Sequence, residues 1–114
     1  MKTQKEINRE YKSMKFRTGI SQIKNKQENK IYLQTSTDLD RAFNSDIFQL
    51  KAGIHSNKIL QKDWNNLSSE VFEFAIYDEL IVKDTATPTE IDHELKELLN
   101  LHLAELKKNG QLFY

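Results

Sequence analysis

The spacing of apolar residues changes several times along the chain, and each change predicts a different element. Apolar and polar residues alternate over positions 20–24 and again over 30–35, on either side of a polar five-residue segment. This alternation is typical of half-buried strands, so the pair predicts a β-hairpin. Positions 72–76 alternate in the same way and predict a third strand. The helix formers at 4–13, with weak apolar periodicity, predict a short N-terminal helix.

Two helices are predicted between the hairpin and the third strand. Apolar residues recur every three or four positions over 39–50, which gives one apolar face. The hydroxyl of Ser36 or Thr37 can cap the first free N–H groups of this helix, and Gly53 can end it. The hydroxyl of Ser56 can cap the second helix, which is shorter.

A leucine-rich helix is predicted after the third strand. Thr87 and Glu90 have the spacing of a capping box, and Pro88 stands at the first helical position, where its missing N–H costs no hydrogen bond. Leucines continue to Leu106, and Gly110 can end the helix. The order predicts an α/β fold of the layered α+β kind, in which helices pack around a small antiparallel sheet of about three strands.

A single domain is expected for a chain of 114 residues. We assign residues 18–110 to its core, 1–17 to an N-terminal helical extension, and 111–114 to a tail that adds an edge strand or packs back on the core. The absence of cysteine excludes disulfides and cysteine-bound metals. The sequence has neither a membrane-spanning apolar run nor the apolar core of a secretory signal, so a cytoplasmic location is expected.

Charge is unevenly distributed along the chain, although the formal net charge is zero. Residues 1–30 contain nine Lys and Arg against three Glu, a net of +6, so the remainder carries −6. A basic N-terminal third can meet phosphate groups, and the alternative is a solvated helix and hairpin surface. The overall balance by itself does not indicate a nucleic-acid partner.

Four short motifs, taken with their spacing, resemble the GIY-YIG nuclease superfamily. The first two are GIS at 19–21 and YLQ at 32–34, on the strands of the predicted hairpin. The others are HSNKILQKDWN at 55–65 and FEF at 72–74. Together they are similar to the small bacterial branch of the superfamily over residues 5–110. The resemblance implies a hairpin with the two tripeptides, a helix with an arginine, a third strand, and a helix with a metal-binding glutamate.

Most of the superfamily's catalytic positions carry different residues here. Tyr32 matches the tyrosine of the second tripeptide, but Ser21 stands where the first has an aromatic hydroxyl thought to help activate water. Gln34 replaces a glycine and adds a side chain where the backbone is normally bare. The resemblance places the phosphate-binding arginine at Ser45 and the metal-binding glutamate near Asn100.

These replacements imply the loss of phosphodiester cleavage. That reaction needs a divalent cation, an activated water and stabilisation of the charged transition state. The favoured hypothesis is a catalytically inactive, GIY-YIG-like pseudo-nuclease that acts by binding, without a cofactor and with DNA as the first candidate partner. Candidate DNA-binding residues are Lys24, Lys26, Lys30, Arg41, His55 and Lys58. His55 has the alternative role of fixing the turn between two helices.

Two other functions stay open. The first is a protein-interaction module, such as an inhibitor or regulator, because Asp38, Asp40 and Asp46 would face DNA and repel its phosphates. The second is a weak metal-dependent DNA endonuclease, in which Arg41 and Glu97 replace the lost arginine and glutamate and Mg²⁺ or Mn²⁺ is the cofactor.

Neither the histidines nor the aromatic residues predict a further site. His93 and Glu97 stand four residues apart and His102 follows, but a metal needs another ligand and outer-shell partners, so no metal site is predicted. The regularly spaced aromatic residues are predicted to lie in the core. They are Trp64, Phe48, Phe72 and Phe74.

Overall fold

The computed structural model describes residues 17–114 of the chain. The predicted helix at 4–13 lies outside the described residues. In chain order the elements are β1 (Thr18–Asn25), β2 (Lys30–Ser36), α2 (Leu39–Ala52), α3 (Lys58–Asn66), the short 3₁₀ helix η1 (Ser69–Val71), β3 (Phe72–Leu80), α4 (Pro88–Lys108) and β4 (Leu112–Phe113). The predicted hairpin, two helices, third strand and last helix are therefore all confirmed.

One four-stranded sheet, in the order β3-β1-β2-β4, organises the described residues. β1 pairs antiparallel with β2 and with β3, and its register with β3 shifts between Ile20 and Ser21. The expected antiparallel sheet of three strands is correct for β1, β2 and β3. It is incomplete, because β4 adds a short parallel strand beside Lys30 and Ile31.

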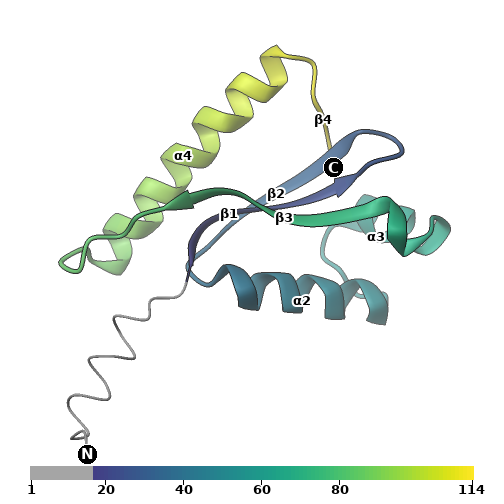
Figure 1. Ribbon diagram of the computed structural model, residues 1–114, viewed down its shortest axis with the longest axis horizontal. Helices are drawn as coiled ribbons and strands as arrows, with labels where there is room; N and C mark the ends of the chain where they lie inside the picture. Colours follow the sequence, from purple (N-terminus) through teal and green to yellow (C-terminus); the bar gives the residue numbers. More distant parts are fainter. Residues whose placement is uncertain (1–16) are drawn as a thin grey trace, which may run out of the picture.

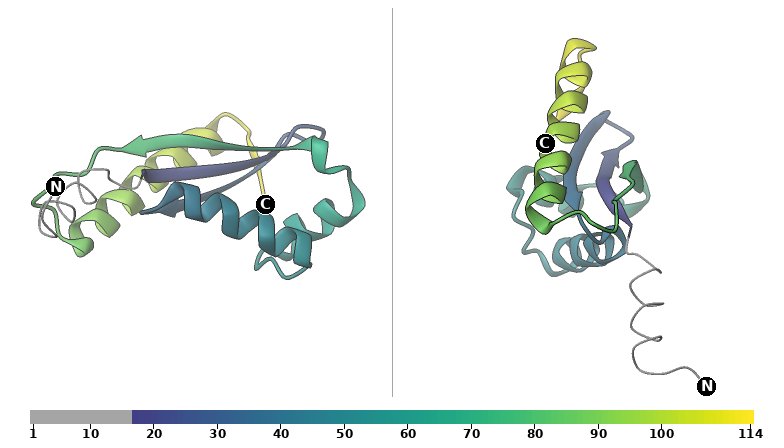
Figure 2. Two further views of the ribbon diagram at one scale, coloured as in Figure 1. Left: turned by 60° about the horizontal axis from the view of Figure 1, so that its bottom comes forward. Right: turned by 90° about the vertical axis from the view of Figure 1, so that its left-hand side faces the viewer.

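The sheet lies between two helical layers (Figures 1 and 2). α2 and α3 cover one face and α4 crosses the other, so the fold is an α/β sandwich. Helices α2 and α3 together are called the α2–α3 layer below. The central apolar cluster lies between this layer and the sheet and consists of Ile23, Leu50, Leu60 and Phe72. On α4, Leu95 is buried.

Local capping begins each helix, but the capping residues differ in part from those predicted. The Asp38 carboxylate, rather than a hydroxyl, accepts from the backbone of Arg41 at the start of α2. Asn57, rather than Ser56, caps α3 by accepting from Leu60 N. Thr87 caps α4 as predicted, with its hydroxyl 3.1 Å from Glu90 N. Asp and Asn compete well with Ser at this position because their side-chain oxygens reach the same N–H groups.

The C-terminal residues pack against the domain as well as forming a strand. The hydroxyl of Tyr114 donates to Asp63 at 2.7 Å and accepts from the side chain of Asn25 at 2.8 Å. Tyr114 thus joins β1 to α3, and both predicted fates of the tail are realised. The predicted core position of Phe48 is wrong, because its side chain is 67% exposed on the outer side of α2.

No helix within residues 17–114 is both long and apolar enough to cross a membrane.

Candidate functional site

Strand pairing brings three of the predicted site residues together. Ser21 lies opposite Gln34, and Ile23 lies opposite Tyr32. Residues opposite one another in an antiparallel pair share a face, and so do residues two apart along a strand. Ser21, Tyr32 and Gln34 therefore lie on the same face as Ile23 of the central cluster, which is the face covered by α2 and α3.

A buried polar network connects this face of the sheet to α2 and to the loop after it. The Gln34 amide donates to one carboxylate oxygen of Asp46 at 2.6 Å. The other oxygen lies 3.1 Å from Nε2 of His55. Asp46 and His55 are only 4% and 1% exposed. Buried polar groups of this kind are tolerated because each finds a partner, and within the described residues no buried side-chain N or O lacks one.

The backbone around His55 fixes both the position and the tautomer of its ring. The N–H of Asn57 donates to Nδ1 at 3.0 Å, so Nδ1 carries no proton. The proton is then on Nε2, which donates to Asp46. The His55 N–H donates to the Gln61 side chain, whose amide donates in turn to Leu50 O. His55 therefore holds the α2–α3 turn, its predicted alternative role, and its buried ring is not available to a DNA phosphate.

Tyr32 lies at the end of this network. Its hydroxyl donates to Gln34 Oε1 at 3.3 Å, and its ring meets that of His55 edge-on with centroids 5.5 Å apart. Burial, together with the negative charge of Asp46, raises the pKa of Tyr32, and a hydrogen bond with Ser56 partly offsets the rise. The phenol is therefore held protonated more firmly than a free tyrosine.

Burial also raises the pKa of Asp46 above its ordinary value. The hydrogen bond and the electrostatic interaction with His55 lower the pKa, and so does the hydrogen bond from Gln34. Asp46 was expected to face DNA on the surface of its helix, and that expectation is wrong. Asp46 lies on the same helical face as Leu39 and Leu50, seven residues after one and four before the other, and this face packs on the sheet.

The remaining residues at the implied catalytic positions lie at the surface of the helices, outside the buried network. Ser45 is exposed on α2, where its hydroxyl accepts from Gln49 at 2.8 Å. Asn100 is exposed on α4, which lies across the sheet (Figure 2). Arg41 is exposed in the first turn of α2, whereas Glu97 is on α4, 3.0 Å from His93. The structure therefore places Ser21 and Tyr32 on one face of the sheet. It does not bring Ser45 together with Asn100. Arg41 and Glu97 are likewise not brought into one site.

The basic DNA-binding candidates are spread over the hairpin and the α2–α3 layer. Lys26 is exposed in the β1–β2 turn, and Lys24 is half-buried in β1. Lys30 lies 3.5 Å from Glu28 and over the Tyr114 ring. Lys58 is exposed at the start of α3, as Arg41 is on α2.

The sequence patterns did not predict the network itself, nor a second polar pair that joins α4 to the sheet. His102 of α4 lies 2.7 Å from Asp78 of β3, and its ring meets Tyr77 edge-on. The spacing of Asp46 with Leu39 and Leu50 could have indicated its burial. Within residues 17–114 no group of three His, Asp or Glu side chains is placed to hold a metal ion.

Comparison with known proteins supports the resemblance seen in the motifs. No family model matches the chain. Over 65 residues, 57% of the chain, it is 34% identical to intron-associated endonuclease 1 of enterobacteria phage T4, and it spans 26% of that protein's length. The catalytic domain of the homing endonuclease I-TevI superimposes with a TM-score of 0.65 and 28% identity, over 83% of this chain and 94% of that one.

A second structure of the same domain, a glutamate-to-alanine variant, gives a TM-score of 0.67 and 26% identity over 87% of this chain and 93% of the other. The four-stranded sheet with its helices matches that catalytic domain. The chain thus has the fold of the GIY-YIG nuclease superfamily, and the resemblance predicted from its tripeptides is confirmed.

Proposed function

We propose that this chain is a GIY-YIG-like pseudo-nuclease of the cytoplasm that binds DNA and does not cleave it. The similar proteins are an intron-associated endonuclease and a homing endonuclease, which supports DNA as the partner. Exposed cations on the hairpin and the α2–α3 layer, including Lys26, Arg41 and Lys58, support contact with phosphates.

The buried carboxylate of Asp46 carries the proposal that cleavage is lost. It lies on the same network as Tyr32, the one tyrosine retained from the two tripeptides. A scissile phosphate brought against Tyr32 would approach this charge, and charge repulsion is little screened in a buried setting. The raised pKa of Tyr32 also disfavours the phenolate, which is the form that could accept a proton from water.

Gln34 supports the same conclusion because its side chain lies between the Tyr32 hydroxyl and the Asp46 carboxylate. Its amide bridges Tyr32 and Asp46, where the resemblance implies a glycine and open backbone. The alternative of a weak nuclease is less well supported, because Arg41 and Glu97 belong to helices on opposite faces of the sheet (Figure 1). Mg²⁺ or Mn²⁺ would be the cofactor only under that alternative.

The expected result with duplex DNA is a salt-sensitive complex and no strand cleavage. Gel-shift titrations and plasmid nicking would both be run with Mg²⁺ and with Mn²⁺. We expect the affinity of the Lys26→Ala/Lys58→Ala variant to fall. The magnitude of its salt slope should decrease by about one for each phosphate that the variant no longer neutralises.

The matched control is Lys96→Ala/Lys107→Ala, which removes the same charge from α4. Equal losses in the two variants would mean that net charge, and not these positions, governs binding. Metal-dependent nicking by the unmodified protein would refute the loss of cleavage. No shift even at low salt would refute DNA binding and favour the protein-interaction alternative.

A further inference from the structure

Three large apolar side chains are exposed at the junction of α2 and α3. Phe48 is 67% exposed, and Ile54 and Ile59 are each 59% exposed. The end of α2 explains why two of them are neighbours. Gly53 is left-handed with φ of 77°, and Ile54 N donates to Gln49 O at 2.9 Å. This is the Schellman arrangement, which brings the residue after the glycine back over the last turn, next to Phe48.

Two lysines lie beside these apolar residues. Lys51 lies one turn from Phe48 on α2, and Lys62 lies one turn from Ile59 on α3. Both are exposed, and neither is paired with a carboxylate within the described residues. The first turn of α3 has no acidic residue. Phe48, Lys51, Ile54, Ile59 and Lys62 are called the α2–α3 patch below.

The outer side of α4 has the opposite character. Leu101 is 65% exposed there. Glu94, Glu97 and Glu105 stand seven and four residues before it and four after it, all exposed and all on the same side of the helix. Leu101 and these three glutamates are called the α4 stripe below.

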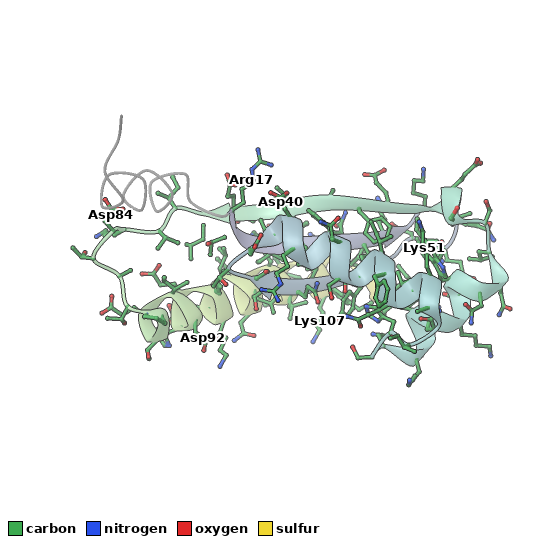
Figure 3. The ribbon with its side chains drawn as sticks, turned by 90° about the horizontal axis from the view of Figure 1, so that it is seen from below. Arg17, Asp40, Lys51, Asp84, Asp92 and Lys107 are labelled. Atoms are coloured by element: carbon green, nitrogen blue, oxygen red, sulfur yellow. The ribbon has the colours of Figure 1, made fainter. Side chains whose placement is uncertain are left out.

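The α2–α3 patch and the α4 stripe are complementary in charge. They lie on opposite faces of the sheet, so the two surfaces of one molecule cannot contact each other. Phe48 and Ile59 each have a lysine one turn away, whereas Leu101 has three glutamates on its side of α4, with Lys108 at the end of the helix. Seen from the α2 side, α2 and α3 lie in front of the sheet and α4 lies behind it, with Lys51 and Lys107 marking the two layers (Figure 3). An amphipathic helix that lays its apolar side on an apolar groove is a common mode of recognition.

We propose that the α4 stripe of one molecule docks on the α2–α3 patch of a second copy of this chain. Leu101 then lies among Phe48, Ile54 and Ile59, and the flanking glutamates meet Lys51 and Lys62. The contact is heterologous because its two halves are different surfaces. Because these lie on opposite faces of the sheet, the contact does not close a dimer and each added molecule leaves a free surface at both ends. The proposal does not rest on DNA binding, although Lys58, a proposed phosphate contact, directly precedes Ile59 of the α2–α3 patch.

The first test is sedimentation of the full chain, without DNA, over a range of protein concentrations. A single exposed helix gives a small interface, so we expect weak association that grows with concentration and decreases as salt rises from about 0.05 M to about 0.5 M. A protein that stays monomeric at every concentration in low salt would overturn the proposal.

Two charge-reversed variants, one for each surface, give the decisive test. Lys51→Glu/Lys62→Glu disables the α2–α3 patch, and Glu97→Lys/Glu105→Lys disables the α4 stripe. Each variant alone is expected to lose at least about tenfold in association, because like charges then face one another. Mixed together, they share one intact pair of surfaces, and their two reversed surfaces again carry opposite charges. The mixture is therefore expected to regain association, with the two variants alternating in the assembly.

Matched variants with the same charge changes elsewhere control for net charge. They are Lys26→Glu/Lys83→Glu and Glu70→Lys/Glu73→Lys, all at exposed positions outside both surfaces. Association as strong as that of the unmodified protein is expected for each. Two single substitutions that change no charge, Phe48→Ser in the patch and Leu101→Ser in the stripe, should also each weaken association. Equal loss in the control variants, or no loss in either reversed variant, would overturn the proposal, and a mixture that remains monomeric would do the same.

Discussion

Replacing Gly19 with alanine is expected to lower the free energy of unfolding by about 3 kcal/mol or more. Gly19 opens the first tripeptide and lies between Ser36 of β2 and Glu79 of β3. A Cβ atom at this position would overlap the carbonyl oxygen of Asp78 and lie 2.8 Å from Cα of Glu79. Both are backbone atoms of a paired strand, so neither can move aside without breaking the β1–β3 ladder. Urea unfolding monitored by the fluorescence of Trp64 measures the loss.

Gly53→Ala provides the control, because the reason for glycine there is different. Nothing lies within 4 Å of a Cβ at Gly53, but its φ of 77° is unfavourable for alanine. We expect a cost of about 1 kcal/mol from this backbone strain alone. Equal destabilisation by the two substitutions would show that close approach of β3 does not explain Gly19.

The second large effect is expected for His55→Ala, at about 3–4 kcal/mol at pH 7. The substitution leaves a cavity, removes one of the two hydrogen-bond partners of the buried Asp46 carboxylate, and removes the acceptor of the Asn57 N–H. His93→Ala is the comparison. His93 is exposed, and its partner among residues 17–114 is the exposed Glu97, so its loss should change stability by less than about 0.5 kcal/mol.

The deficit of His55→Ala should shrink as the pH falls. In the unmodified protein His55 lowers the pKa of Asp46, although burial raises it overall. Removing His55 raises that folded-state pKa further above the unfolded value of 3.8. A raised folded-state pKa favours the folded state below the unfolded pKa, and that advantage is lost as pH rises through the folded pKa. The penalty is therefore largest at neutral pH and is relieved when Asp46 becomes protonated.

Unfolding free energies at pH 7 and at about pH 4.5, for both proteins, measure this difference. The double variant Asp46→Asn/His55→Ala should be more stable than His55→Ala at pH 7, because the buried charge at position 46 is gone, and should lack the pH trend. A deficit of His55→Ala that stays constant between the two pH values would mean that its cost is cavity formation and not the carboxylate.

The fold was largely predictable because its signals are local. Alternation at 20–24, 30–35 and 72–76 depends on neighbouring residues, and all three strands form. Pro88 and Thr87 begin α4, and Gly53 ends α2, as the sequence indicates. Identifying the capping side chain was harder, because Asp38 and Asn57 compete with adjacent hydroxyls for the same N–H groups.

The candidate site was less predictable because its partners are distant in sequence. The two tripeptides and Tyr32 were found from motifs, and the strand pairing then showed that Tyr32 and Ser21 share a face. Asp46 was expected outside and is inside, whereas Phe48 was expected inside and is outside. Both errors concern which side of α2 meets the sheet. Helical periodicity alone does not fix that side when a carboxylate stands on the inner face and a phenylalanine on the outer.

The sequence by itself determined the order and kind of the elements, the resemblance to the GIY-YIG superfamily, and which side chains stand at its catalytic positions. Only the tertiary structure showed that Gln34, Asp46 and His55 join Tyr32 in one buried network, and that α2 and α3 cover one face of the sheet and α4 the other. The physical reason is the distance along the sequence between the residues that interact. Strands and helix caps are set by residues a few positions apart, whereas burial of a charge depends on partners brought together by the whole fold.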